Sequence, residues 1–381
     1  MSEQSISAAQ IFDGCSFQSQ KQIIWEKDHI IAIKDCSKLP QNSKIILPGF
    51  INLHCHLELT ALEGLLPQKK DFPQWVEVLQ KHTAAFSTHD WEKSVQKGLD
   101  LSLQSGVTSI FDVGNSGATW SAEISTPIRL WAAVELLGNA GEDTLPPPLG
   151  PPKHRRGYSA HALYSCGGDC WHKAKDFCQK NDFPFSFHLA ESLAEHKLLT
   201  QGQGIMRSWL DAKTPHHNFK KPGLAPLARA LKLGVLQGSI AVHGNTLSPE
   251  DLQNLAQNQC GLVHCPQSAE WFGHPPLDML SCDKSDLPVS IGSDSLASAH
   301  SLSLWEQMAV FAKNHPHYSV EEVLARVTSV PAQILGEESS LGSLTPGSKA
   351  DFMVVEWGQN WEQLPQVQQV YISGKLVYEN I

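Results

Sequence analysis

The chain has 381 residues, more than one ordinary domain of about 100–150 residues needs. Its 41% hydrophobic content can bury a large core, which excludes a globally disordered chain. Lysine and arginine number 29 against 39 aspartate and glutamate residues, so the formal net charge is -10. This balance argues against a nucleic-acid partner, because neutralising phosphates requires a basic face.

No targeting or membrane segment is visible in the sequence. The opening residues Met1–Gln4 carry no charged stretch leading into an apolar one, as a secretory signal would. No apolar run approaches the roughly 20 residues that a membrane helix needs. The 9 cysteines include no C-x-x-C pair, so a zinc ribbon or thioredoxin-like motif is not indicated. We therefore expect a cytoplasmic protein with free thiols. We expect no membrane partner. The chain could form a homo-oligomer.

The first predicted elements are two short strands. Ile23–Trp25 and His29–Ile33 are apolar runs separated by polar turn residues. Short apolar runs bounded in this way are typical of β-strands. They precede the longer apolar runs that dominate the chain.

From Leu47 onward, short apolar runs alternate with helix-like stretches. Buried parallel strands read as continuous apolar runs, and alternation with helices indicates βα units. The predicted strands are Leu47–His56, Val107–Val113, Ile128–Leu136, Gly157–His161, Phe185–His188, Ser239–His243, Gly261–His264 and Pro288–Asp294. The predicted helices are Phe72–Phe86, Asp90–Gln104, Trp171–Lys180, Met206–Leu231, Ser248–Asn258 and Ser301–Lys313. About eight such units predict an α/β fold closed as a (β/α)8 TIM barrel.

The chain ends in further short strand-like runs. These are Phe352–Val355, Val370–Ile372 and Leu376–Tyr378. We expect them to pair with the first strands of the chain, so that both termini form one small β-sandwich beside the barrel. The predicted domains are therefore the sandwich, residues 1–47 and 343–381, and the barrel, residues 48–342.

The strongest local signal is the pair His54 and His56. Residues two apart on a strand point to the same face. At the carboxyl end of the first barrel strand, both side chains would project into the mouth, where active sites of this fold lie. Two imidazoles so placed suit a Zn²⁺ or Fe²⁺ site. The alternative is a chance H-x-H in a chain with 18 histidines.

A second signal follows the strand that ends at His188. Glu191 stands three positions later, where the strand gives way to a loop or helix. This spacing suits a third metal ligand and a nearby carboxylate that moves protons without binding the metal. The alternative is a surface glutamate that opens a helix. Glu195 and His196, further along, are predicted to be solvated helix residues.

A third signal is the acid at the tip of Val289–Ser295. Asp294 could bind a metal and accept a proton from water there, or it could simply cap the following helix. His243 and His264 also end apolar runs. A lone histidine in such a place is more often a core residue than a catalyst. Five strands that end in histidine or aspartate on one barrel face favour a metal centre.

Together these motifs resemble the amidohydrolase superfamily, in its TRZ/ATZ-type mononuclear aminohydrolase branch. The resemblance covers nearly the whole chain, from Leu47–Phe50 to Gly342–Phe352. Tyr158–Ser165 is similar to the family's S-P-H-A-P-Y-[ST] run, with both prolines replaced. Cys265–Ser268 resembles its C-P-x-S-N run, with Ala269 where asparagine is usual. Both departures lie in loops that shape the substrate pocket.

The resemblance implies one divalent metal ion, Zn²⁺ or alternatively Fe²⁺. Its ligands would be His54, His56, His188 and Asp294. Binuclear relatives bridge two ions with a carboxylated lysine at the end of the fourth strand. No lysine occurs in Gly157–Tyr164, which favours one ion.

The resemblance also implies the catalytic roles. The metal would generate hydroxide at neutral pH, and this hydroxide would attack an amine-bearing ring carbon. Asp294 would take the water proton, and Glu191 would protonate the ring nitrogen and help ammonia depart. His243 would position the hydroxide and stabilise the developing oxyanion. His161 is expected to contact the substrate.

The substrate is predicted from two further segments. Trp271–Pro276 and Gly292–Ser298 resemble the group that contains the aminodeoxyfutalosine deaminases of the alternative menaquinone pathway. An adenine-type nucleoside is therefore expected, with Trp271, Phe272 and His274 as pocket contacts. For the two aromatic residues, ordinary packing is the alternative. Deamination of S-adenosylhomocysteine or methylthioadenosine is the nearest alternative reaction, followed by deamination of guanine or an s-triazine, or dechlorination of a triazine.

Two hypotheses come from other classes of protein. A catalytically silent barrel used as a binding module would have damaged ligand positions, and none is damaged here. A metal-free isomerase or aldolase barrel would have no reason to concentrate histidines at the strand ends. The sequence therefore predicts a hydrolase that acts on a small aminated heterocycle.

Overall fold

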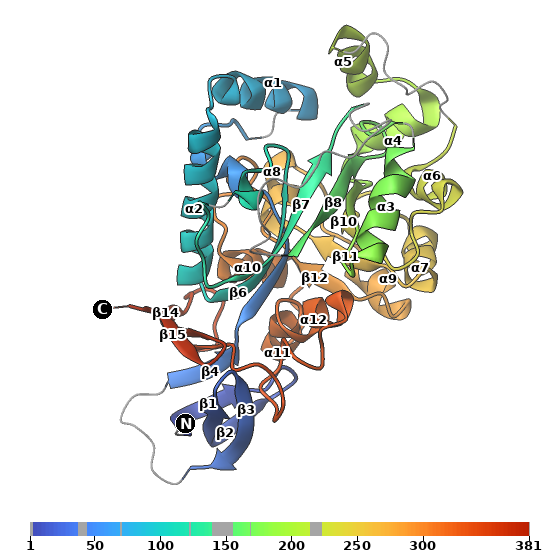
Figure 1. The fold of residues 1–381 in the computed structure, drawn as a ribbon. Coiled ribbons are helices and arrows are strands. Elements are labelled where there is room, and N and C mark those ends of the chain that lie inside the picture. Colours follow the sequence, from blue (N-terminus) through green and yellow to red (C-terminus); the bar gives the residue numbers. More distant parts are fainter. Residues whose placement is uncertain are drawn as a thin grey trace.

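Two sheets form the framework of the chain in the computed structural model (Figure 1). The structure describes residues 3–36, 44–68, 71–121, 123–138, 155–167, 169–213 and 223–380. One sheet has eight strands and the other has seven. The strands near both ends of the chain belong to the second sheet, so the two termini share it.

The eight-stranded sheet is a parallel barrel whose strands follow one another in chain order. A parallel bridge between Cys55 and Asp294 joins the first strand to the residues after the last one. The expected (β/α)8 fold is thereby confirmed, with strand positions close to the predicted runs. The strands are β5 (Phe50–Cys55), β6 (Val107–Gly114), β7 (Arg129–Leu136), β8 (Arg155–Ala162), β9 (Ser186–Leu189), β10 (Ile240–His243), β11 (Gly261–His264) and β12 (Val289–Ile291).

Helices surround the barrel strands, and α1 and α5 lie beyond one end of the barrel (Figure 1). None of the helices in the described part of the chain has both the length and the apolar character to cross a membrane. The helices are α1 (Phe72–Thr83), α2 (Thr88–Gln104), α3 (Cys170–Lys180), α4 (Leu193–Gln201), α5 (Ile205–Lys213), α6 (Pro226–Leu233), α7 (Pro249–Gln257), α8 (Pro266–Phe272), α9 (Met279–Lys284), α10 (Leu304–Asn314), α11 (Val320–Ala325) and α12 (Ser329–Leu335). Two short 3-10 helices are η1 (Leu57–Leu62) and η2 (Ala118–Trp120).

The single helix predicted over Met206–Leu231 is wrong. The structure has α5 and α6 there, and residues 214–222 between them lie outside the described residues. Pro226 occupies the first turn of α6, where its missing N–H costs nothing. Gly223 has a φ of 119°, which no helix accommodates. Both helices contain buried apolar residues, such as Met206 in α5 and Leu227 in α6, so the apolar spacing continues across the break.

The seven-stranded sheet combines strands from both ends of the chain. Its order is β15-β14-β13-β4-β1-β2-β3, and the central pair β4 and β13 is antiparallel. Trp25 and Phe352, from opposite ends of the chain, share its separate apolar core. The expected pairing of the two ends is confirmed, whereas the domain boundaries at 47/48 and 342/343 stay a prediction. The strands are β1 (Gln4–Phe12), β2 (Phe17–Glu26), β3 (His29–Asp35), β4 (Lys44–Pro48), β13 (Phe352–Glu356), β14 (Gln366–Ile372) and β15 (Lys375–Glu379).

Gly49 connects the two sheets. The predicted strand Leu47–His56 is two strands, β4 and β5, that meet at this residue. A Cβ atom at Gly49 would lie 2.2 Å from the side chain of Thr108 on β6. Only glycine therefore allows the chain to pass from the terminal sheet into the barrel here. This junction fixes where β5 enters the barrel and where His54 and His56 lie.

Candidate metal centre and active site

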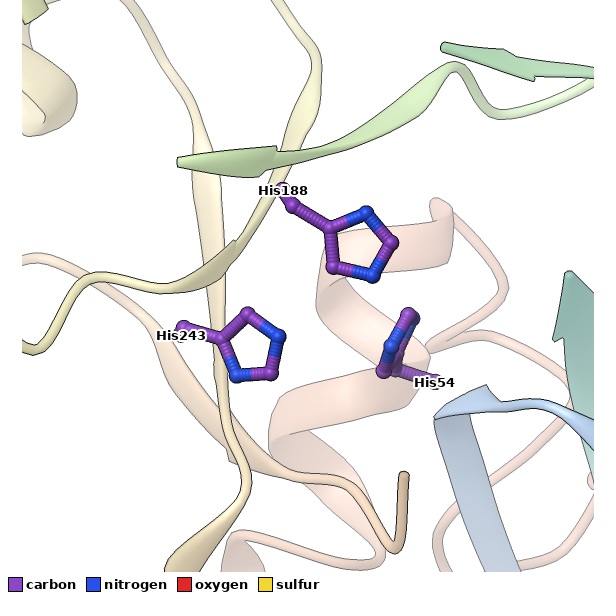
Figure 2. A group of neighbouring side chains, drawn as sticks. All are labelled: His54, His188 and His243. Atoms are coloured by element: carbon purple, nitrogen blue, oxygen red, sulfur yellow. The ribbon is translucent and has the colours of Figure 1, made fainter. Parts of the chain in front are cut away.

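Three buried histidines from different barrel strands point toward one another (Figure 2). His54 lies near the end of β5, His188 lies on β9 and His243 ends β10. The ring centroid of His54 is 4.9 Å from that of His188 and 5.8 Å from that of His243. The rings of His188 and His243 are 5.2 Å apart. The carboxyl ends of the strands thus bring three predicted site residues together.

His54 shows most directly that the cluster fits a cation. Its side chain is completely buried, and neither ring nitrogen has a hydrogen-bond partner. A buried polar group without a partner costs about 1–3 kcal/mol, so such groups are rare in native proteins. A metal ion satisfies an imidazole nitrogen that no protein group reaches.

Asp294 and His56 complete this side of the cluster. Asp294 Oδ1 lies 3.9 Å from His54 Nε2 and 3.8 Å from His56 Nε2. Both separations are too long for hydrogen bonds and leave room for a cation between the atoms. Asp294 Oδ2 accepts a hydrogen bond of 2.9 Å from Ser298 Oγ, which fixes the carboxylate.

The backbone is strained where two of these side chains originate. His243 has a φ of 74° and Asp294 has a φ of 57°. Left-handed conformations of non-glycine residues cost of order 1–3 kcal/mol and cluster at functional sites. The amide groups of Ser293 and Asp294 both donate to the carbonyl oxygen of His54 at 3.1 Å. These bonds hold the strained turn against β5.

The donor atoms form overlapping groups that could hold a divalent ion. Within each group, the ligand atoms all lie within 4.8 Å of one another. Imidazole nitrogens with carboxylate oxygens are ligands typical of zinc and iron sites. Among the described residues, the groups are His54, His188 and His243; His54, His56 and Asp294; and His56, Glu135 and His188. The residues present therefore fit a cation.

The electrostatic environment keeps most of these imidazoles neutral. Burial, followed by repulsion from neighbouring imidazoles, holds the pKa of His54 and of His243 well below the usual value. Burial lowers the pKa of His188 to about 4. His56 differs, because nearby carboxylates led by Glu135 outweigh burial and raise its pKa. Neutral imidazoles offer the free nitrogen that a metal requires.

Glu191 lies beside the histidine cluster, with its side chain 14% exposed. Its Oε1 is 3.8 Å from His243 Nε2. Burial, followed by the negative charges of Asp294 and Glu195, raises the pKa of Glu191 well above its usual value. This shift favours the protonated carboxyl, the form that a proton donor requires.

Glu195 corrects one expectation from the sequence. It was predicted to be solvated, yet it is only 2% exposed. Its Oε2 accepts a 2.8 Å hydrogen bond from the backbone N–H of Glu191. The residue is buried because it lies in the first turn of α4, which folds back over the end of β9. Glu195 therefore fixes the backbone that carries Glu191.

A cavity of about 720 Å³ opens above the cluster. His56, His188, Glu191, His243 and Asp294 all line it. Its remaining wall is largely apolar and comes mainly from α1, α5 and the loops that follow the strands. The apolar part includes Phe72, Trp75, Val76, Leu79, Leu137, Leu163, Trp209 and Leu210.

The predicted substrate contacts divide into two pairs. His161 and Phe272 line the cavity. Trp271 and His274 are not among the described residues that line it. Trp271 is instead 6% exposed, within an apolar cluster that also contains Trp75. Trp271 thus packs among apolar side chains, which was the alternative to a substrate contact.

The sequence interpretation missed Glu135, which lies near the end of β7. It lines the cavity, and its Oε1 is 3.4 Å from His188 Nδ1. Burial raises the pKa of Glu135 to about 7. An acid within the apolar run Ile128–Leu136, one position before its end, was the available signal. Buried acids of this kind are rare unless paired or functional.

The chain is similar to a known family and to several named proteins. The model described as the amidohydrolase family matches residues 45–377. The aminodeoxyfutalosine deaminase of a Nitratiruptor species is 25% identical over 350 residues, covering 87% of this chain and 82% of the relative. The 5-methylthioadenosine/S-adenosylhomocysteine deaminase of Symbiobacterium thermophilum is 23% identical over 382 residues, covering 90% and 83%.

Solved structures with low sequence identity share the fold. The aminofutalosine deaminase of Helicobacter pylori, in complex with methylthio-coformycin, has a TM-score of 0.83 at 20% identity. That match covers 98% of this chain and 100% of the other. The atrazine chlorohydrolase of Arthrobacter aurescens, complexed with zinc, has a TM-score of 0.80 at 17% identity, covering 99% and 95%. At these identities the likeness shows the fold alone.

Proposed function

Because this chain belongs to the amidohydrolase family, we propose that it is a metal-dependent deaminase of an aminated heterocycle. The reaction consumes one water molecule, replaces a ring C–NH₂ group by C=O and releases ammonia. One observation carries the proposal. The donor atoms of His54, His56 and Asp294 lie within 4.8 Å of one another, as do those of His54, His188 and His243, and Glu191 lines the same cavity as His56, His188 and Asp294.

We assign the metal to the predicted ligands. His54, His56, His188 and Asp294 would hold one divalent ion, Zn²⁺ or alternatively Fe²⁺. Such an ion, when bound, lowers the pKa of water from 15.7 to about 7 and so supplies a nucleophile at neutral pH. The zinc in the Arthrobacter aurescens chlorohydrolase supports zinc as the first choice.

Glu191 is the proposed proton donor to the substrate. Because burial raises the pKa of Glu191 and so favours its protonated form, the carboxyl can give a proton to a ring nitrogen. Protonation there makes the adjacent carbon more electrophilic. After regaining a proton, the same carboxyl protonates the departing amino group. The backbone hydrogen bond to Glu195 holds Glu191 in place for both transfers.

Asp294 and His243 are the proposed proton acceptor and oxyanion donor. Asp294 accepts a proton from the attacking water, because the bond from Ser298 to Oδ2 leaves Oδ1 directed toward His54 and His56. His243 is buried and neutral, so it can donate a hydrogen bond to the developing oxyanion. A preorganised donor of this kind contributes about 2.7–4 kcal/mol to catalysis.

The substrate that we favour is an adenine-type nucleoside, in particular aminodeoxyfutalosine of menaquinone biosynthesis. The relatives from Nitratiruptor and Helicobacter pylori carry the names of this activity. A nucleoside with an extended apolar substituent also suits a cavity of about 720 Å³ with an apolar outer wall. His161 and Phe272, which line the cavity, are the proposed substrate contacts among the predicted ones.

A second candidate is the deamination of methylthioadenosine or S-adenosylhomocysteine. The Symbiobacterium thermophilum relative carries that name. The two candidates share the purine and the catalytic residues and differ in the substituent on the ribose. Guanine and s-triazines lack the ribose and its substituent, so these smaller molecules would leave the apolar wall of the cavity without a contact.

Ammonia release from metal-loaded protein tests the proposed function. The substrates to compare are aminodeoxyfutalosine, methylthioadenosine, S-adenosylhomocysteine, guanine and an s-triazine, with metal content measured on the same sample. We expect the highest kcat/KM with aminodeoxyfutalosine. No ammonia from any of these compounds would overturn the assignment as a deaminase.

The variant Glu191→Gln tests the proton donor. We expect turnover to fall by about 10²–10⁴-fold while metal content and Tm stay unchanged. Glu250→Gln is the matched control, because Glu250 is exposed in the first turn of α7, away from the cavity. Near-normal turnover of Glu191→Gln would remove Glu191 from the mechanism.

A further inference from the structure

Glu135 approaches one ring nitrogen of His188. Its Oε1 lies 3.4 Å from His188 Nδ1. The side chain of Glu135 is 3% exposed, and that of His188 is 8% exposed. Both groups are thus removed from water, where a charge and a hydrogen-bond donor interact more strongly than at a surface.

The hydrogen bonds of Glu135 leave one oxygen unused. Oε2 accepts a 2.9 Å hydrogen bond from Asn115 Nδ2, which holds the carboxylate in place. Oε1 is buried and has no hydrogen-bond partner within usual distance. The nearest imidazole donor position to it is His188 Nδ1, at 3.4 Å. A small rotation of either side chain would close this contact.

The tautomer of His188 follows from its other neighbour. Its Nδ1 lies 2.9 Å from the carbonyl oxygen of His161. Because a carbonyl oxygen only accepts, Nδ1 must carry the proton. The lone pair of His188 is then on Nε2, the ring nitrogen that is not in contact with the His161 carbonyl. Nδ1–H has two acceptors, the His161 carbonyl and the Glu135 carboxylate.

The group formed by His56, Glu135 and His188 could also be read as a second cation site. Two of its three members, His56 and His188, already belong to the predicted ligand set. A neutral imidazole has one free lone pair and cannot bind two ions at once. The geometry therefore favours one ion, with Glu135 behind a ligand.

We propose that Glu135 is a positioning residue of the metal centre, whose carboxylate holds His188 with Nε2 turned toward the ion. This inference rests on the metal site of the proposed function, though not on the identity of the substrate. Carboxylates behind ligating histidines fix the ring orientation and raise the basicity of the ligand. Losing such a partner typically costs 10–100-fold in metal affinity or activity.

Direct zinc titration of the metal-free protein tests the proposal without an activity assay. We expect Glu135→Leu to bind Zn²⁺ about 10–100-fold more weakly than the wild type, with one ion per chain in both. Glu135→Gln should lose less, because its amide oxygen can still accept from His188 Nδ1–H. Far-UV circular dichroism and Tm of the metal-free proteins establish that each variant folds. If Glu135→Leu does not fold, Glu135→Gln carries the test.

Glu58→Gln is the matched control. Glu58 is a buried carboxylate that lines the same cavity, but it accepts from the backbone N–H groups of Asn115 and Ser116 instead of from a histidine. Its variant should bind zinc within about threefold of the wild type, which corresponds to less than about 0.7 kcal/mol.

Three results would overturn the proposal. One is zinc affinity within twofold of the wild type in the folded Glu135 variants. Another is an equal loss in Glu58→Gln, which would assign the effect to buried charge in general. The third is two ions in the wild type and one in Glu135→Leu, which would make Glu135 a direct ligand. If zinc binds as expected but no ammonia is released, only the proposed function fails.

Discussion

Buried imidazoles make the folded chain sensitive to acid. His264, on β11, is 2% exposed, and burial lowers its pKa to about 3 from 6.5. Between these pH values the unfolded chain binds a proton that the folded chain does not. The contribution of His264 to the free energy of unfolding is therefore retained above pH 6.5 and falls as the pH decreases toward 3, by about 1.4 kcal/mol per pH unit between these values.

The variant His264→Gln isolates this contribution. Urea denaturation of metal-free protein at pH 6.5 and pH 5 should show the wild type losing about 1.6 kcal/mol more stability than the variant over this interval. The other buried histidines are common to both proteins and cancel in the comparison. Parallel losses in the two proteins would contradict the assignment to His264.

At the scale of residues, the sequence predicted the site residues whose relative positions follow from a local pattern. His54 and His56 are two positions apart on one strand, so their shared direction followed from strand geometry. Glu135 and His188 become neighbours only when β7 and β9 take their places in the barrel. The burial of Glu195 likewise depends on how α4 returns over β9. Such long-range proximity has no local signature.

Among the helices, α1 has the closest relation to the cavity. Trp75 Nε1 donates a 2.8 Å hydrogen bond to the carbonyl oxygen of Ala297, three residues after Asp294. Trp75 also packs in an apolar cluster with Trp271 and Ala297, separate from the core of the barrel. Helix α1 is thus held over the cavity by a small contact area, with Phe72 and Leu79 facing the substrate space.

Truncating the tryptophan should weaken substrate binding more than chemistry. We expect Trp75→Ala to raise KM about tenfold, equivalent to about 1.4 kcal/mol, with kcat within about threefold. Trp75→Phe keeps an aromatic side chain and loses only the hydrogen bond, so its KM should lie between those of the wild type and Trp75→Ala. A large fall in kcat for Trp75→Ala with unchanged KM would refute this view of α1.

At the scale of elements, the barrel strands were predictable because burial on both faces makes them continuous apolar runs. Strand β6, for example, is buried along its full length. The boundary between α5 and α6 was missed because apolar spacing outweighed Pro226 in the prediction. The division of β4 from β5 at Gly49 was missed because both strands are apolar and the break arises from contact with Thr108.

For the whole molecule, metal binding and folding are coupled. An ion that binds only the folded chain stabilises it by about 2.7 kcal/mol at a concentration 100 times Kd. Because the unfolding entropy of 381 residues is about 0.8 kcal/mol/K, chelation should lower Tm by about 3 °C, and added Zn²⁺ should restore it. Asp294→Asn, which lacks one proposed ligand charge, should respond much less. An unchanged Tm in the chelated wild type would contradict the proposed site.

The pairing of β4 with β13 can form only late in the synthesis of the chain. Ile46 pairs with Val354, about 300 residues further along the chain. At about 5–20 residues per second, roughly 15–60 s separate the two strands on the ribosome. Throughout this interval β4, which leads through Gly49 directly into the strand of His54 and His56, has no antiparallel β13 partner. A chain interrupted before β13 would therefore keep the pairing of β4 with β1 and of β5 with β6, but β4 would have a partner on one side only. The segment that leads into the candidate site thus gains its second neighbour among the last events of translation.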